Sequence, residues 1–278
     1  MTALGGTISV AGHQVPRLGF GTMRLSGPDI FGPPADRDEC VRTVRAAYDG
    51  GVRLFDTAWY YGPDVSSAIV KEALHPYADD VVFVSKLGGA RTDDGGWVPA
   101  VTPGALRDGA ERELRLLGID ALPVVHLRFM PGGPETVYDE MLGTFLELRE
   151  EGLIREIGLS TVSVEQLDRA ISAGVHVSTV SNAYGPGNVA DKPVLDRCAE
   201  LGIPFLPYFG VIGAHASEGI QQVAQELDAS PQQVSIAWQL ATSPVVVPIP
   251  GTSKVAHLRE NLAAADLVLT PEQVASIG

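Results

Sequence analysis

The chain has 278 residues, of which 45% are hydrophobic, enough to bury the core of a large domain. Acidic residues outnumber basic ones by 34 to 20, and the net charge of −14 repels nucleic-acid backbones and anionic membrane surfaces. Two distant cysteines, Cys40 and Cys198, give no support for a zinc or other metal site or for a disulfide framework. No leader pattern or membrane-spanning apolar run is found. We therefore expect a cytoplasmic protein with a small-molecule partner, with neither nucleic acid nor membrane as partner. The oligomeric state stays open.

One pattern recurs along the chain: a helix-like stretch, a glycine, and an apolar run that ends in polar residues. The glycine stands where a helix C-cap needs left-handed backbone, and the run has the length of a buried parallel strand. The pattern occurs at residues 46–57, 113–126, 147–160, 170–181 and 198–208. With three further apolar runs, it predicts strands near residues 18, 54, 81, 122, 156, 178, 204 and 245. Segments such as 38–48 and 102–117 have helical periodicity.

Eight alternating β–α units in roughly 250 residues predict an α/β fold, a (β/α)8 TIM barrel, over the alternative of a doubly wound sheet. A β-hairpin at residues 6–16 is expected to close the bottom of the barrel. No linker or shift in composition divides the chain, so residues 1–278 are expected to form a single domain. The loops that leave the strands are longer than those that enter them. In such barrels this end carries the active site.

Several predicted strand ends carry residues suited to acid–base chemistry. Asp56, Lys86 and His126 end successive strands, and Tyr61 follows Asp56 closely. A tyrosine has an unperturbed pKa of about 10, so general-acid work near neutrality requires a group that favours its phenolate. A lysine ammonium would do so, and an aspartate would keep that lysine charged. Each residue alone would also fit a helix cap, a buried ion pair or a core histidine, but their combination favours catalysis.

The last predicted strand runs into Pro250-Gly251-Thr252-Ser253-Lys254, immediately before a helical segment. Unpaired N–H groups at the helix start, two hydroxyls and an ammonium would together form an anion site. The alternative is that Thr252 or Ser253 only caps the helix. Neither a G-x-G-x-x-G fingerprint nor a phosphate-binding P-loop motif is present.

Five segments in order resemble the aldo-keto reductase family: FDTAWYYG at 55–62, VSKLG at 84–88, VVHLR at 124–128, IGLS at 157–160 and PIPGTSKVAHLRENLAA at 248–264. The similarity extends over essentially the whole chain and is strongest to bacterial pyridoxal-reductase-like members. It implies a catalytic tetrad of Asp56, Tyr61, Lys86 and His126. In this tetrad Tyr61 would be the general acid, Lys86 and Asp56 its tuning pair, and His126 the group that orients the carbonyl.

The same resemblance implies NADPH/NADP as cofactor. Its binding residues would be Gly21, Thr22, Ser160, Ser181, Tyr208, Gly251, Thr252, Ser253, Lys254 and Asn261. Thr161 and Ser181 stand where the family often has Asn and Gln, and their hydroxyls reach less far than an amide. Gly251 replaces a basic residue of some members, so Lys254 would be the main charge for the adenosine 2′-phosphate.

The substrate pocket is expected to have apolar and aromatic walls. Strand alternation after His126 points Arg128 toward the mouth of the barrel, where it would meet an anionic or hydrogen-bonding substrate or only bridge to a loop carboxylate. The predicted substrate-binding residues are Met23, Trp59, Trp97 and Arg128. The expected function is NADPH-dependent reduction of aldehydes or ketones, by an NADP-dependent oxidoreductase. The alternatives are an NADP(H)-binding sensor module with little turnover and a Schiff-base lyase that uses Lys86.

Overall fold

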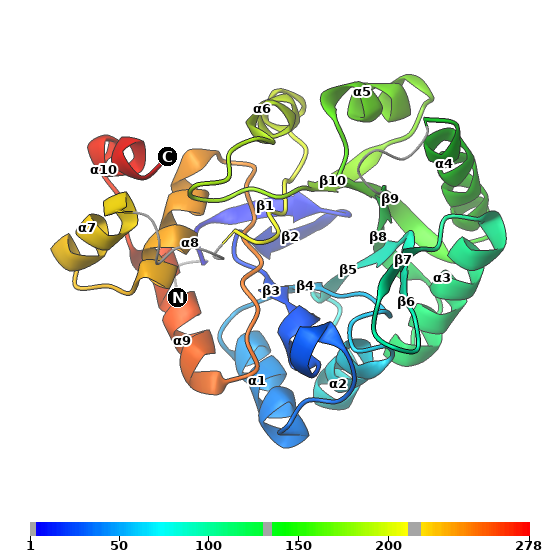
Figure 1. The fold of residues 1–278 in the computed structure, drawn as a ribbon, viewed down its shortest axis with the longest axis horizontal. Coiled ribbons are helices and arrows are strands. Elements are labelled where there is room, and N and C mark those ends of the chain that lie inside the picture. Colours follow the sequence, from blue (N-terminus) through cyan, green and yellow to red (C-terminus); the bar gives the residue numbers. More distant parts are fainter. Residues whose placement is uncertain (1–3, 130–134, 211–217) are drawn as a thin grey trace.

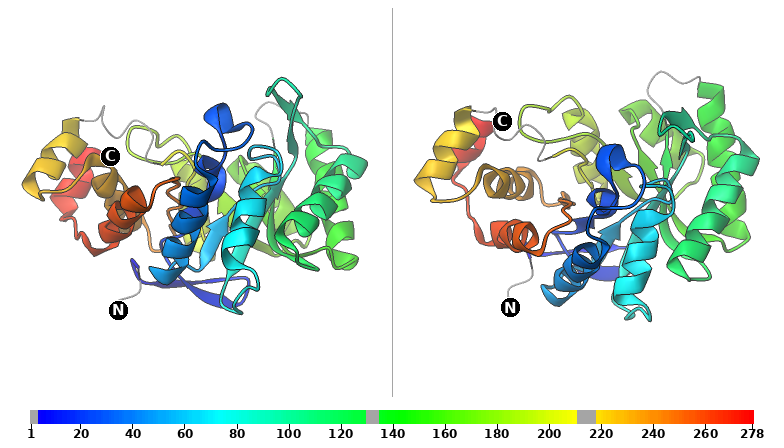
Figure 2. Two further views of the ribbon diagram at one scale, coloured as in Figure 1. Left: turned by 90° about the horizontal axis from the view of Figure 1, so that it is seen from below. Right: turned by 60° about the horizontal axis from the view of Figure 1, so that its bottom comes forward.

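A two-stranded hairpin, β1 (Thr7–Val10) and β2 (His13–Pro16), lies across one end of the barrel in our computed structural model, which describes residues 4–129, 135–210 and 218–278 (Figures 1 and 2). The strands pair antiparallel around a turn at Ala11 and Gly12, which both have positive φ. The apolar side chains of the hairpin, Val10 and Val15, pack inside the barrel, so the hairpin predicted at residues 6–16 is confirmed.

Six parallel strands form the barrel sheet in the order β10-β9-β8-β5-β4-β3. They are β3 (Phe20–Gly21), β4 (Leu54–Asp56), β5 (Val82–Leu87), β8 (Leu122–Arg128), β9 (Ile154–Ser160) and β10 (Val177–Ser181). These match the first six predicted strands. A further antiparallel pair, β6 (Gly89–Arg91) and β7 (Trp97–Pro99), stands in the loop after β5.

The last two predicted strands, near residues 204 and 245, are reduced to isolated bridges. Phe205 bridges in parallel to Val180 on one side and to Val246 on the other. The N–H of Gly19 then donates to the carbonyl of Pro248 over 2.9 Å, which closes the barrel. Prolines interrupt both segments and remove the N–H donors that a continuous ladder needs. These prolines are Pro204, Pro207, Pro248 and Pro250.

Helices surround the sheet (Figure 1). They are α1 (Arg37–Asp49), α2 (Val65–Leu74), α3 (Pro103–Leu117), α4 (Glu135–Glu150), α5 (Val164–Ser172), α6 (Lys192–Leu201), α7 (Glu218–Glu226), α8 (Pro231–Thr242), α9 (Val255–Ala263) and α10 (Pro271–Ile277). A glycine with positive φ follows the helix in each of the five predicted repeats. In the part of the chain that the structure describes, no helix is long and apolar enough to cross a membrane.

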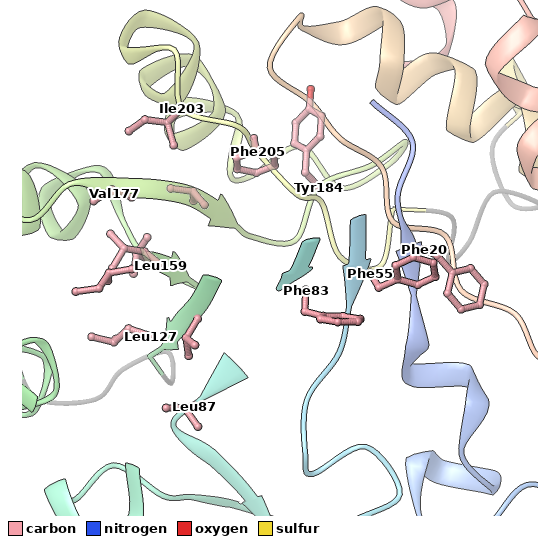
Figure 3. Close-up of a cluster of buried hydrophobic side chains, with 14 of the residues drawn as sticks. Phe20, Phe55, Phe83, Leu87, Leu127, Leu159, Val177, Tyr184, Ile203 and Phe205 are labelled. Carbon is pink, nitrogen blue, oxygen red and sulfur yellow. The ribbon is translucent and has the colours of Figure 1, made fainter. Parts of the chain in front are cut away.

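Strand side chains alternate between two apolar layers. Phe20, Phe55 and Phe83 point toward the helices, with ring centroids 6.2 and 6.3 Å apart, and Leu87, Leu127 and Leu159 continue this layer (Figure 3). Leu54, Val84 and Val124 instead fill the bottom of the barrel against the hairpin. The inward positions above this plug are polar: they are Asp56, Lys86, His126 and Arg128.

Candidate active site

Two cavities at the carboxyl ends of the strands join into one groove. The inner cavity, of about 450 Å³, is lined by Asp56, Tyr61 and Lys86, and the outer one, of about 570 Å³, by the segment that leads into α9. The two cavities share Met23, Arg24, Ile30 and Gly251. The groove therefore runs from the strand ends of the barrel to the start of α9.

Lys86 and Asp56 form a buried ion pair on the floor of the inner cavity. The Nζ of Lys86 lies 2.5 Å from Oδ1 of Asp56 and also donates to the carbonyl of Thr57 over 3.2 Å. Their side chains are only 1% and 5% exposed. Burial raises the pKa of the Asp56 carboxyl, and the Lys86 ammonium opposes that rise. The register of the two strands explains this ion pair. Asp56 on β4 lies beside Val84 on β5, and Lys86 is the next residue of β5 whose side chain points into the barrel.

Tyr61, in the turn after β4, faces the same cavity. Its ring centroid lies 5.3 Å from the Nζ of Lys86. Burial raises the pKa of the Tyr61 phenol and the Arg128 guanidinium acts against that rise, so the net direction is opposite to the lowering expected from the sequence. The reason is that desolvation of the phenolate outweighs the nearby positive charge. The neighbouring Tyr60 also lines the cavity.

A buried carboxyl on α3, Glu113, lies behind the ion pair. It accepts hydrogen bonds from Ser67 and Ser85 over 2.9 and 3.0 Å, and Ser67 contacts the hydroxyl of Thr57 over 2.8 Å. Burial raises the pKa of Glu113 to about 7. Glu113 was not among the residues predicted from the sequence. The signal was present, because Glu113 is a charged residue on the otherwise apolar stripe of α3.

His126 lies below the cavity and lines neither cavity. Its Nε2 is 2.8 Å from Oγ1 of Thr179, and burial lowers the pKa of the imidazole well below its usual value. In the register, His126 stands beside Lys86 on one side and Gly158 on the other. The structure thus brings Asp56, Tyr61 and Lys86 together at one cavity with His126 registered beside Lys86, and the role of His126 in orienting the carbonyl stays a prediction. Nδ1 of His126 is buried without a hydrogen-bond partner among the residues that the structure describes.

Arg128, two residues after His126, lines the cavity. Met23 and Trp97 do as well, as expected for substrate-binding positions. Trp59 does not: the guanidinium of Arg112 lies 4.6 Å from its ring centroid, and it packs beside α3. Its ring also packs against that of Tyr60, with centroids 5.7 Å apart, so its part in substrate binding stays a prediction. Phe209 and Gln239 also line the cavity and were not predicted.

Of the residues predicted to bind the inner part of the cofactor, some line the groove and others are buried beside it. Gly21 and Gly251 line the groove where their backbones meet, and an added Cβ would come within 2.6 Å of the Ile249 carbonyl and 2.5 Å of the Gly21 carbonyl respectively. Tyr208 also lines it, with its hydroxyl 3.2 Å from that of Thr161. Thr22, Ser160 and Ser181 are buried beside the groove instead.

Unpaired polar atoms at the inner end fit a nicotinamide and its ribose. Oδ2 of Asp56, Oγ1 of Thr22 and Oγ of Ser181 are buried without a hydrogen-bond partner among the residues described here. A buried polar group without a partner is costly, so such atoms mark positions where a bound molecule supplies the missing bond. The residues present therefore fit a dinucleotide at this end of the groove.

At the outer end of the groove, the start of α9 has fewer free N–H donors for an anion than the sequence predicts. Thr252, Ser253 and Lys254 line the outer cavity, and Asn261, further along α9, lines neither. Two N–H groups at the start of α9 are already used: Lys254 N donates to Oγ1 of Thr252 and Val255 N to Oε1 of Glu39, over 3.2 and 3.0 Å. The expectation of unpaired N–H groups is thus wrong at these two positions.

The barrel, the buried lysine–aspartate pair beside a tyrosine and the long groove define the class of an oxidoreductase that uses a dinucleotide. A sequence profile of the aldo/keto reductase family matches residues 17–215 and 211–278, and the chain belongs to this family.

Similar proteins agree with this membership. The chain is 40% identical over 277 residues to the pyridoxine 4-dehydrogenase of Escherichia coli K12, covering 98% of this chain and 96% of that protein. It is 35% identical to an uncharacterized oxidoreductase of Schizosaccharomyces pombe, covering 98% and 89%. Among solved structures, an aldo-keto reductase from Klebsiella pneumoniae in complex with NADPH superposes with a TM-score of 0.78 at 25% identity, covering 98% and 93%.

Proposed function

We propose that the protein is a cytoplasmic, NADPH-dependent reductase that converts aldehydes or ketones to alcohols with Tyr61 as general acid. The observation that carries this proposal is the position of Tyr61 in one cavity with the buried Lys86–Asp56 pair. NADPH, when bound, supplies the hydride that reduces the carbonyl carbon. The groove supports this cofactor because it leads from the unpaired atoms around Asp56 to Lys254, one of the groove's cations.

The Lys86–Asp56 pair beside Tyr61 gives the tyrosine its proposed task. Since burial raises the pKa of Tyr61, the phenol holds its proton at physiological pH and can donate it to the oxygen that becomes an alcohol. The Lys86 ammonium, fixed by Asp56, lies close enough to stabilise the phenolate left behind. The apolar and aromatic walls at Met23 and Trp97 favour an aromatic or bulky carbonyl compound. The relationship to a pyridoxine 4-dehydrogenase adds pyridoxal to the substrates worth testing.

The lyase alternative is disfavoured by the environment of Lys86. A Schiff-base lysine needs an accessible neutral amine, whereas the ammonium of Lys86 is 1% exposed and paired with a carboxylate. Borohydride should therefore trap no carbonyl compound on Lys86. The sensor alternative predicts tight NADPH binding without turnover, and only kinetics distinguishes it from a reductase.

The decisive experiment follows NADPH oxidation with a panel of aromatic aldehydes that includes pyridoxal, together with sugar ketones and bulky cyclic ketones. We expect Tyr61→Phe to lower kcat by about 10² or more with little change in NADPH affinity, since only the transferable proton is removed. Tyr48→Phe on α1, outside both cavities, is the matched control. Full activity of Tyr61→Phe would refute the role of this residue, and NADPH binding without oxidation by any substrate would favour the sensor.

A further inference from the structure

The inner cavity contains two hydrogen-bond donors that the proposed proton transfer from Tyr61 does not use. They are the hydroxyl of Tyr60 and the guanidinium of Arg128, and both residues line this cavity. Tyr60 is 1% exposed, and its hydroxyl has no hydrogen-bond partner among the residues that the structure describes. A buried polar group without a partner is costly, so this hydroxyl marks a place where a bound molecule supplies the missing bond.

Aromatic packing fixes the position of the Tyr60 hydroxyl. The Tyr60 ring makes edge-to-face contacts with three other rings, and the centroids of Trp59, Tyr61 and Trp97 are 5.7, 5.4 and 5.7 Å away. The hydroxyl lies near Gly89, where an added Cβ would be 3.9 Å from the hydroxyl oxygen. Burial raises the pKa of the Tyr60 phenol, so the hydroxyl keeps its proton at neutral pH and acts as a donor.

Arg128 brings a positive charge that no carboxylate balances in the described part of the chain. Its guanidinium carbon lies 5.6 Å from the ring centroid of Tyr208, and no hydrogen bond or ion pair to the guanidinium is found among the described residues. The Arg128 charge acts against the rise in the pKa of Tyr60, so the two groups lie within electrostatic reach of each other. In the same cavity, by contrast, the charge of Lys86 is balanced by Asp56. A charge that is shielded from water and has no partner is unfavourable, so Arg128 favours a bound anion.

The two donors lie close to the place where the carbonyl group would react. The rings of Tyr60 and Tyr61 are neighbours, and Tyr61 stands beside the ammonium of Lys86. One small molecule can therefore place its carbonyl oxygen at Tyr61 and a second oxygen at Tyr60 and Arg128. A charged guanidinium and a neutral hydroxyl, which both donate, are suited to an oxygen that carries a negative charge.

We propose that Arg128 and Tyr60 form a binding site for an anionic oxygen substituent, a carboxylate or a phenolate, on the carbonyl substrate. The inference rests on the proposed reductase function and names the class of its substrate: an aromatic aldehyde or ketone that also carries a negative charge. The anion accepts hydrogen bonds from the guanidinium and from the Tyr60 hydroxyl, while Tyr61 donates its proton to the carbonyl oxygen. Because charge-assisted hydrogen bonds are roughly twice as strong as neutral ones, Arg128 has the larger effect on the choice of substrate.

The first test measures how the protein selects substrates by charge. The probes are the positional isomers of carboxybenzaldehyde and their methyl esters, which keep the ring and the aldehyde and lack the charge. We expect wild-type kcat/KM to be at least about tenfold higher for one of the acids than for its ester, the scale of a hydrogen bond to a charged group. Arg128→Gln should remove most of this preference, Arg128→Lys should keep part of it, and Tyr60→Phe should lower it about two- to fivefold.

The matched control is Arg155→Gln on β9, which removes an exposed guanidinium that lines neither cavity and should leave the preference for the acid unchanged. No preference for any of the acids in the wild type, or a preference that Arg128→Gln does not lower, would overturn the proposal.

Urea unfolding separates a role of Tyr60 in binding from a role in folding. Tyr60→Phe keeps the ring and removes a hydroxyl that has no partner in the described structure, so it should be at least as stable as the wild type while it binds the acid less tightly. A clear loss of stability would show that the hydroxyl serves the fold and would overturn its assignment to the substrate.

A second test does not depend on turnover. In the protein saturated with NADP no hydride is available, so the binding of each acid and of its ester can be titrated by calorimetry without reaction. We expect Arg128→Gln to weaken the binding of the preferred acid at least about tenfold more than that of its ester. Equal losses for acid and ester would refute the anion site. A wild-type protein that reduces no carbonyl compound would instead refute the reductase function, and the titration would still decide whether Arg128 and Tyr60 bind an anion.

Discussion

The charged side chains at the two ends of the groove differ in their exposure to solvent. At the inner end, the Lys86–Asp56 pair is almost completely shielded from solvent, and Arg128 and Tyr61 lie beside it. At the outer end, the ammonium of Lys254 is exposed and shares the helix start with the carboxylate of Glu39. Coulomb interactions between buried groups are strong and little affected by salt, whereas those between exposed groups are weak and screened. We therefore expect large effects of substitution at the inner end and small, salt-dependent ones at the outer end.

The largest expected effect comes from removing the buried lysine. Lys86→Met should lower kcat by about 10² or more, because the phenolate of Tyr61 loses its nearby cation. It should also destabilise the fold by about 3–5 kcal/mol, the usual cost of leaving a buried charge without its partner. Urea unfolding and steady-state kinetics measure the two effects.

The double variant Asp56→Asn/Lys86→Met separates stability from catalysis. It removes the orphaned carboxylate, so it should regain much of the lost stability and none of the lost activity. A single variant as stable as the wild type would contradict the view that the inner end behaves as a dry, low-dielectric site.

At the inner end of the groove, the residues that could be predicted from the sequence are those whose position depends on one short segment of the chain. Asp56 and Lys86 end apolar runs, and Tyr61 stands a short turn later, so local pattern was enough to find them. The position of His126 depends on how β8 is staggered against β5, which no single strand reveals. The same limit applies to the outer end, where the contact between Glu39 and Val255 spans 216 positions. The barrel itself was predictable from the repeat, but the prolines of its last two segments reduce them to isolated bridges.

At the outer end, Lys254→Ala should weaken NADPH binding about tenfold and leave NADH binding nearly unchanged, because the two cofactors differ only in the 2′-phosphate. Fluorescence titrations with both cofactors, at low and high salt, measure this difference. Raised salt should weaken wild-type NADPH binding more than NADH binding. Lys192→Ala, in an exposed pair with Asp196 on α6, is the control. Equal losses for both cofactors would mean that Lys254 supports the helix rather than the phosphate.

The smallest expected effect has the opposite sign and concerns Glu39. The N–H of Val255 and the guanidinium of Arg42 hold the pKa of Glu39 below its usual range, so its carboxylate is charged at neutral pH. It lines the cavity that contains Lys254 and would repel a phosphate there. Glu39→Gln keeps an oxygen that can accept from Val255 and removes the charge. We expect NADPH affinity to rise about two- to threefold, the modest scale of an exposed and screened interaction.

The control for this variant is Glu72→Gln on α2, which removes an exposed carboxylate of an ion pair with Arg37 and lines neither cavity. NADH affinity should change less than NADPH affinity in Glu39→Gln, and the gain should shrink in high salt, because the repulsion acts on the 2′-phosphate through solvent. A loss of affinity for both cofactors would show instead that the charged carboxylate is needed to hold the start of α9. In that case Glu39 would position the helix, and its charge would not oppose the phosphate.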